Sequence, residues 1–138
     1  MLGDTLDQSL LDKIREARER IENRGAALRT LVEIAEPGRQ NRAAGILTRV
    51  EALENADSGV TARVPSEDGK NVYSVSIALF RRPGGQEVTR EQTCTCYDNR
   101  RSGSCKHIIA VAAKWIRTYH ADWKRLKAAE AILTPASP

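Results

Sequence analysis

Apolar residues in the first quarter of the chain recur with the period of an α-helix. Between residues 5 and 35 they alternate at steps of four and three, which is the seam of a helix that packs on another helix. The seam consists of Leu10, Ile14, Ala17, Ile21, Arg24, Leu28, Leu31 and Ala35. Arg24 and the following Gly25 weaken its middle. We therefore expect this helix to pair within the chain, with a dimer or a coiled coil with a partner as the alternatives.

The pattern then changes from a helical period to the period of a strand. Residues 41–56 continue the helical period, after Pro37 has ended the first helix because proline lacks the backbone N–H. Segments that alternate between apolar and polar residues follow at 60–64, 72–80 and 87–94. The turn-forming segments "PSEDGKN" and "RRPGGQ" separate them, so the sequence predicts an antiparallel meander of three strands. The more apolar face of the middle strand carries Val75 and Ile77 and is expected to face the core.

The helical period returns after the third strand. Residues 107–133 form a predicted helix whose seam includes Ile108, Trp115 and Tyr119. Asp122 falls on the same seam and predicts a break near residues 120–122. Trp115 is therefore expected to pack in the core or between helices.

All three cysteines and one of the two histidines lie between the last strand and the last helix. Cys94, Cys96, Cys105 and His107 follow the pattern C-x-C, eight residues, C-x-H. Three thiols and one imidazole form a complete tetrahedral set for zinc, a composition found in structural sites. Because residues i and i+2 of a helix point to nearly opposite sides, Cys105 is expected before the helix and His107 in its first turn. Turn-forming residues between the pairs allow the chain to fold back.

Other roles for these cysteines are less favoured by the same residues. A disulfide would leave one cysteine over, and a C-x-C bridge is strained. Redox chemistry of the thiols remains an alternative. A catalytic cysteine needs a positioned base, and a catalytic zinc keeps one coordination position open for water. No phosphate-binding glycine loop or paired carboxylates stand out, so we expect that the chain is not an enzyme.

The local sequence resembles a known zinc-binding family. "YSVSIALF" leads into "QTCTC", and "SCKHIIAVAAKWI" follows. These three segments are similar to the entering strand, the knuckle and the exit helix of the SWIM-type zinc-finger domain, and the resemblance spans about residues 58–117. The resemblance implies one structural zinc ion on Cys94, Cys96, Cys105 and His107, and a function in binding DNA or proteins. Most such domains are attached to a helicase, transposase or kinase domain, whereas here we expect a stand-alone module.

Together these patterns predict the α+β fold class. The expected order is N-terminal helices, a three-stranded antiparallel meander, a zinc knuckle and a C-terminal helix, as in a β-β-α zinc finger. The expected regions are a helical region for packing or oligomerisation (1–57), a SWIM-like zinc-binding domain with a long helix (58–134) and a disordered tail (135–138).

The charge is distributed unevenly along the chain. Residues 1–57 carry nine Lys and Arg against eleven Asp and Glu, whereas residues 81–127 carry eleven against four. A field of one sign favours polyanions. The candidate phosphate contacts are Arg100, Arg101, Lys106, Lys114 and Arg117. The predicted function is therefore a zinc module that binds nucleic acid, with DNA favoured, as an accessory factor in DNA processing. The alternative is a protein–protein adaptor in which zinc only supports the fold.

The expected location follows from the N-terminal residues and from the lengths of the apolar runs. The segment "MLGDTLDQSL" has neither the basic nor the apolar region of a signal peptide. No apolar run approaches the roughly 18 residues of a membrane span. We therefore expect an intracellular protein that does not bind membranes.

Overall fold

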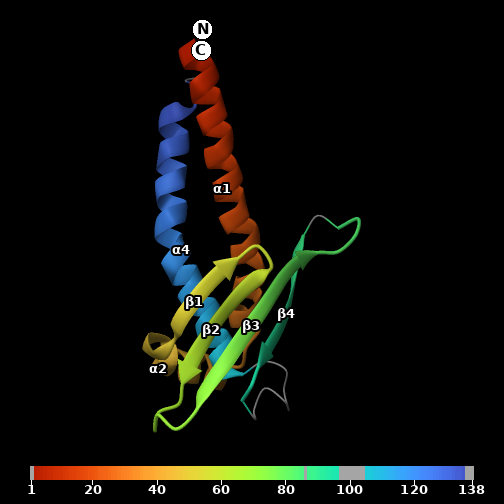
Figure 1. The fold of residues 1–138 in the computed structure, drawn as a ribbon, viewed down its shortest axis with the longest axis vertical. Helices are drawn as coiled ribbons and strands as arrows, with labels where there is room; N and C mark the ends of the chain where they lie inside the picture. The colour runs from red at the N-terminus through yellow and green to blue at the C-terminus, as the bar shows by residue number, and fades with distance from the viewer. Residues whose placement is uncertain (1, 86, 97–104, 136–138) are drawn as a thin grey trace.

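The computed structural model describes residues 2–85, 87–96 and 105–135, with side chains from residue 7 onward. The elements are α1 (Leu2–Glu33), α2 (Pro37–Ile46), the short 3-10 helix η1 (Leu47–Arg49), β1 (Glu51–Ala56), β2 (Gly59–Pro65), β3 (Val72–Arg81), β4 (Val88–Cys94) and α4 (Lys106–Leu133). Figure 1 shows α1 and α4 side by side as a long antiparallel pair. The sheet covers one end of this pair, and α2 lies at the same end.

The α+β class is confirmed, but the predicted number of strands is wrong. The sheet has four antiparallel strands in the order β1-β2-β3-β4. Residues 51–56, which we predicted to be helical, form β1, and α2 ends at Ile46. A two-residue turn at Asp57 and Ser58 lets β1 pair with β2, so that Asn55 lies opposite Val60. Pairing with a neighbouring strand therefore outweighs the helical period of this segment, which is a local signal only.

Arg24 helps to explain why residues 51–56 form a strand, because it fixes the end of β1 to α1. Its guanidinium donates hydrogen bonds to Oδ1 of Asn55 (2.7 Å) and to the carbonyl oxygen of Ala56 (2.6 Å). Arg24 is only 6% exposed. The residue that weakens the apolar seam of α1 thus links the helix to the sheet. These hydrogen bonds join residues that are 31 and 32 positions apart in the sequence, so a local sequence pattern cannot predict them.

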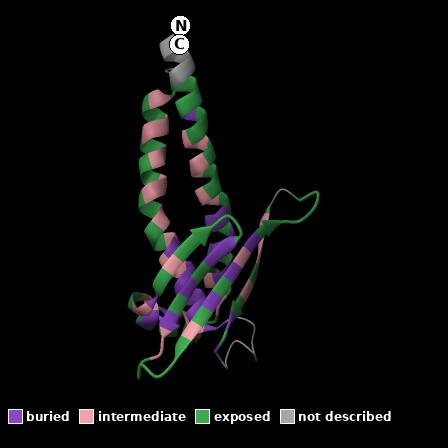
Figure 2. Cartoon of the chain, viewed as in Figure 1, coloured by how far each residue is buried: buried purple, intermediate pink, exposed green. Residues whose placement is uncertain are grey.

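The inner face of the sheet forms one side of the core. As strand alternation predicts, Val75, Ile77 and Leu79 of β3 are buried. The same face of β2 carries buried Val60, Ala62 and Val64, and Val60 pairs with Ile77. In Figure 2, buried residues alternate with more exposed ones along β2 and β3. Residues from both predicted regions, 1–57 and 58–134, contribute to one hydrophobic core.

The first part of α4 is the centre of the molecule. Every residue from His107 to Ala112 is buried, because α1, α2 and the sheet all contact this helix. Trp115 is 1% exposed and belongs to the same core. The predicted break near residues 120–122 is wrong, since α4 is continuous from Lys106 to Leu133. Asp122 is half-buried and forms an ion pair with Arg125 one turn further on.

The far ends of α1 and α4 extend beyond the sheet, and we call residues 7–22 and 118–133 the helical arm (Figure 1). Leu11 is the buried residue of this arm, whereas Leu10, which we predicted for the seam, is 50% exposed. Arg18 pairs with Glu130 of α4 and with Glu22 of its own helix. Arg15 also contacts Glu130, at 3.4 Å. Polar contacts therefore join the two helices of the arm beside half-buried apolar residues such as Ile14 and Ile21, and α1 packs along α4 within the chain.

Two further predictions concern membrane-spanning helices and the C-terminal tail. Among the described helices, none combines the length and the apolarity that crossing a bilayer requires. The predicted tail at 135–138 lies outside the described residues, except for residue 135.

Candidate metal centre

Two of the four candidate ligands leave the sheet from its inner face. Cys94 is the last residue of β4 and pairs with Val75 of β3. The chain then bends at Thr95 and Cys96, while the backbone N–H of Thr95 still donates to the carbonyl oxygen of Ser74 at 3.2 Å. Cys94 and Cys96 are both buried, at 7% and 4% exposure, and Thr95 between them is exposed.

The other two ligands lie at the beginning of α4. Cys105 has extended backbone angles (φ −104°, ψ 171°) and occupies the position before the first helical residue. Its carbonyl oxygen accepts a hydrogen bond from the N–H of Ile109 at 3.2 Å, which begins the helical ladder. His107 lies in the first turn, as the C-x-H spacing predicts. The change from extended chain to helix between these residues brings both side chains to the same side.

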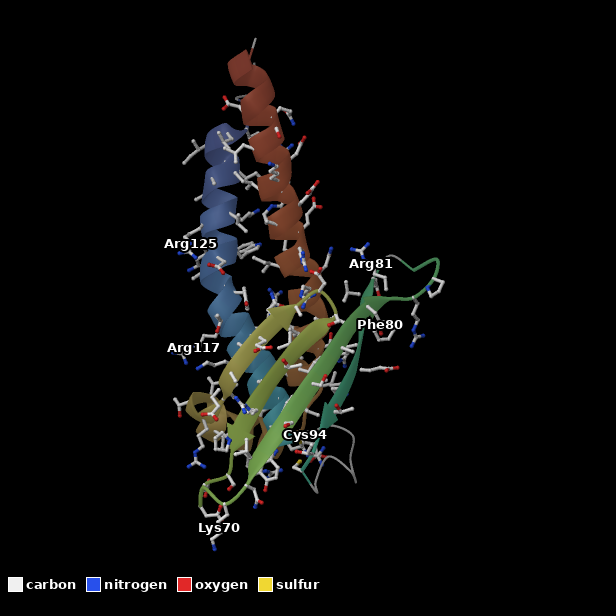
Figure 3. All side chains as sticks on the ribbon, viewed as in Figure 1. Lys70, Phe80, Arg81, Cys94, Arg117 and Arg125 are labelled. Atoms are coloured by element: carbon white, nitrogen blue, oxygen red, sulfur yellow. The ribbon has the colours of Figure 1, made fainter. Side chains whose placement is uncertain are left out.

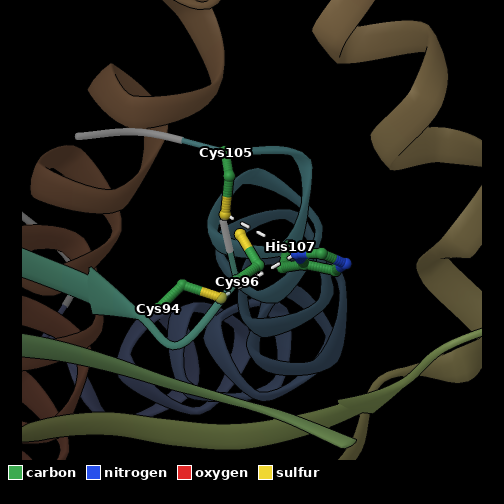
Figure 4. A group of neighbouring side chains, drawn as sticks. All are labelled: Cys94, Cys96, Cys105 and His107. Atoms are coloured by element: carbon green, nitrogen blue, oxygen red, sulfur yellow. Dashed lines mark hydrogen bonds between the residues drawn. The ribbon is translucent and has the colours of Figure 1, made fainter. Parts of the chain in front are cut away.

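The structure brings the four predicted ligands together (Figure 4). Their ligand atoms all lie within 4.8 Å of one another, and all four residues are buried. The distances from Nδ1 of His107 are 3.8 Å to Sγ of Cys94 and 3.7 Å to Sγ of Cys105. In a tetrahedral zinc site with Zn–S of about 2.3 Å and Zn–N of about 2.0 Å, such atoms are about 3.5 Å apart. The cluster could therefore hold one metal ion after only a slight contraction.

The thiols of Cys94 and Cys105 influence each other in the absence of a metal. A hydrogen bond with Cys105 lowers the pKa of the Cys94 thiol. The same bond, together with burial, raises the pKa of the Cys105 thiol to about 12. At neutral pH Cys105 therefore keeps its proton and donates it to Cys94. A metal that binds both sulfurs must displace this proton, so that metal affinity would fall as the pH falls.

The imidazole ring of His107 also packs against an aromatic ring. Tyr73 of β3 lies with its ring centroid 4.5 Å from that of His107, at an interplanar angle of 34°. Strand alternation placed Tyr73 on the inner face, but its neighbour at residue 107 could not be read from the sequence. Tyr73 is thus a supporting residue of the site that sequence reasoning missed.

Comparisons with known proteins found no relative of this chain. No protein-family model matches the chain, and neither a curated protein nor a solved structure is significantly similar to it.

The predicted nucleic-acid contacts fall into two groups. Arg100 and Arg101 lie in residues 97–104, outside the described residues. Lys106 is half-buried in the first turn of α4, beside the candidate metal centre. Lys114 and Arg117 lie on the same helix, about 12 and 16 Å further along its axis. Within the described part of the chain, Lys106, Lys114 and Arg117 form no ion pair with a carboxylate.

Proposed function

We propose that the chain is a zinc-binding module of the SWIM type in which the metal has a structural role. The observation that carries this proposal is the buried group of three thiols and one imidazole with ligand atoms within 4.8 Å. Soft thiolates together with imidazole favour zinc over harder cations, which prefer oxygen ligands. Four protein ligands complete a tetrahedral shell and leave no position for a reactive water. The proposed module is therefore not an enzyme.

We further propose that the module binds nucleic acid, with DNA favoured, through phosphate contacts. Residues 81–127 carry an excess of positive charge, with eleven Lys and Arg against four Asp and Glu. Arg117 is exposed on the side of α4 that points away from α1 (Figure 3). Lys114 and Lys124 lie near this side, because they are three and seven residues from Arg117. Cations that no carboxylate neutralises are available to phosphates.

The test is a titration with DNA and RNA duplexes over a series of salt concentrations. Each phosphate contact contributes about −0.9 to the slope of log K against log salt on duplex DNA. The double variant Lys114→Gln, Arg117→Gln should therefore bind more weakly and reduce the slope by about two. The matched control Lys13→Gln, Arg29→Gln removes the same charge from exposed positions of α1. An unchanged slope in the first variant, or equal losses in both, would contradict this proposal.

A protein partner is the second candidate, and the exposed apolar residues of the helical arm favour it. Leu10 and Ile132 are 50% and 82% exposed, toward the end of the arm that is remote from the sheet. Isolated exposed apolar residues are common, so only a defined partner would support this function. A stoichiometric partner should be lost in the Leu10→Asp, Ile132→Asp variant and retained in Lys114→Gln, Arg117→Gln. The reverse result would favour nucleic acid.

A further inference from the structure

A small pocket adjoins the candidate metal centre and is lined by His107 but by none of the three cysteines. Its volume is about 110 Å³. Its polar lining residues are Arg49, Ser66, Glu67, Tyr73, Lys106 and His107. They come from η1, the β2–β3 loop, β3 and the beginning of α4. At about 30 Å³ for each water of the liquid, the pocket has room for three to four waters, or for one small anion.

His107 lines this pocket and has one ring nitrogen, Nε2, that no hydrogen bond of the described residues uses. Its Nδ1 lies on the thiol side of the ring, so Nε2 lies on the opposite edge (Figure 4). When a metal is bound at Nδ1, the proton of the neutral imidazole resides on Nε2. Ligating histidines almost always donate this second N–H to a carboxylate, a carbonyl or a water. Here the residue is 7% exposed, yet no acceptor among the described residues bonds to Nε2.

Two cations line the same pocket. Lys106 is the first residue of α4, a helix of 28 residues whose first backbone N–H groups favour anions. Arg49 ends η1 on the other side of the pocket. Neither the histidine N–H nor these cations can accept a hydrogen bond. The donors that converge here therefore fit an anion with several acceptor oxygens.

Glu67 is the carboxylate among the residues that line the pocket. Its Oε1 lies 3.7 Å from Nη1 of Arg49, and its side chain is 78% exposed. A loose ion pair this exposed contributes little to stability and is easily replaced. The contact places an anionic oxygen beside Arg49, and Glu67 would compete with any anion that enters.

We infer that this pocket binds one phosphate group, with Nε2–H of His107, Lys106 and Arg49 as its donors. The inference rests on the proposed metal centre, because the metal at Nδ1 places the proton on Nε2. The pocket is too small for a nucleoside, so the recognised group is the phosphate alone. A free phosphate and a phosphate of a nucleic-acid backbone are its two sources. In the second case this site fixes the position of the backbone without reading the sequence.

The first experiment uses inorganic phosphate and the zinc-loaded full chain. The ion is titrated at constant ionic strength, and the NMR signals of the His107 ring and of the Lys106 and Ser66 amides are followed. We expect saturable shifts of these signals. Lys106→Gln and Arg49→Gln should each weaken binding about tenfold, as expected for the loss of a charge-assisted hydrogen bond. Glu67→Gln should strengthen it about threefold by removing the competing carboxylate.

The controls separate loss of binding from loss of the fold. The zinc content of each variant is measured, and Arg49→Gln keeps the four ligands and their sequence neighbours unchanged. Lys13→Gln and Glu91→Gln change the net charge by the same amounts at exposed sites of α1 and β4. The absence of saturable shifts would overturn the inference. So would equal effects of the pocket variants and their charge-matched controls.

The second experiment identifies the source of the phosphate. A short DNA duplex and the corresponding RNA are titrated against the same signals. Shifts at Lys106 and His107 that Lys106→Gln weakens would assign the pocket to a backbone phosphate. Binding of inorganic phosphate without binding of either nucleic acid would keep the pocket and contradict the proposed nucleic-acid function. Nucleic-acid binding that leaves these signals unchanged, while inorganic phosphate still shifts them, would assign the pocket to free phosphate and place the nucleic-acid contacts elsewhere.

Discussion

The helical arm and the end of the molecule that carries the candidate metal centre share the same two helices but differ in what stabilises them. In the arm, Leu11 is the buried residue among those described, and cross-helix contacts such as Arg18–Glu130 are polar. At the other end, α4 is buried on all sides from His107 to Ala112. In a partly buried ion pair such as Arg18–Glu130, the cost of desolvation offsets much of the attraction, whereas each large buried side chain is worth about 1.5–3 kcal/mol. Secondary structure alone therefore does not show where the stability of α4 lies.

The same comparison separates the cations of the molecule. In the arm, Arg15 and Arg18 are satisfied by Glu22 and Glu130. Near the candidate metal centre, Lys106 has no carboxylate partner among the described residues. Cations that are already paired stabilise helices, whereas unpaired ones remain available for a ligand. The binding function is therefore expected at the end that carries the candidate metal centre, and the arm is expected to respond to salt and pH.

Removal of one proposed metal ligand should have the largest effect and should act first on the end that carries the candidate metal centre. Structural zinc contributes about 10 kcal/mol or more of apparent binding energy, comparable to the whole stability of a small domain. We expect Cys105→Ser to lose zinc and the near-UV circular dichroism of the buried Trp115. Glu130→Gln, a change in the arm, should keep both. A Cys105→Ser variant with the wild-type melting temperature would abolish the distinction between the two ends.

The two tryptophans provide the next test, because one belongs to each end. Trp115 is 1% exposed in the core, whereas Trp123 of the arm is half-buried and donates to Oε1 of Glu22 at 2.9 Å. Trp115→Ala should reduce the free energy of unfolding by about 3–5 kcal/mol. Trp123→Ala should cost less, about 1–2 kcal/mol, since this side chain is already partly exposed and one hydrogen bond is lost. Urea unfolding measures both, and equal losses would contradict the comparison.

Acid should weaken the arm through its carboxylates. The hydrogen bond from Trp123 lowers the pKa of Glu22, and the one from Arg18 lowers the pKa of Glu130, each from an ordinary value of 4.5. A carboxylate whose pKa is lowered by folding stabilises the fold fully above its unfolded value. That contribution is lost as the pH falls through the lowered value.

The measurement is the free energy of unfolding of wild type and Glu130→Gln between pH 6 and 3. The difference between them should be largest at pH 6 and shrink as the pH falls below about 4.5. Loss of metal in acid affects both proteins, so the difference isolates the arm. A difference independent of pH would show that the Arg18–Glu130 contact does not contribute.

The smallest expected effect is that of a change at Leu10 of α1, which is best compared with a change at its neighbour Leu11. Leu10 is 50% exposed and Leu11 is 2% exposed. Leu11→Ala should cost about 2 kcal/mol or more, and Leu10→Ala less than about 0.5 kcal/mol. Thermal unfolding of the two variants compares them directly. A larger loss of stability for Leu10→Ala than for Leu11→Ala would contradict the described packing and favour the seam predicted from the sequence.

The sequence predicted features that depend on local spacing and missed those that depend on distant partners. Strand alternation found the buried face of β3, and the C-x-H pair located the beginning of α4. The C-x-C and C-x-H spacings predicted the cluster because each pair lies at the junction of two elements. By contrast, residues 51–56 have a helical period and become a strand by pairing with β2. Arg24 looked like a defect of the seam, yet its hydrogen bonds to β1 fix that strand.

Two further errors have the same origin. Asp122 predicted a break in α4, but an ion pair with Arg125 accommodates it on a half-exposed side of the helix. Leu10 satisfied the spacing of the seam, but the neighbouring Leu11 is the residue that is buried. Tyr73 and Arg49 join the surroundings of His107 through folding alone, and no pattern around them indicates it.

The central claim is that Cys94, Cys96, Cys105 and His107 bind one zinc ion that stabilises the fold. The most direct measurement is elemental analysis of the full chain purified without chelator, beside the Cys105→Ser variant. We predict one zinc per chain in the wild type and loss of zinc in the variant. A wild-type protein that is fully folded and contains no zinc, or that keeps its zinc in Cys105→Ser, would contradict the claim.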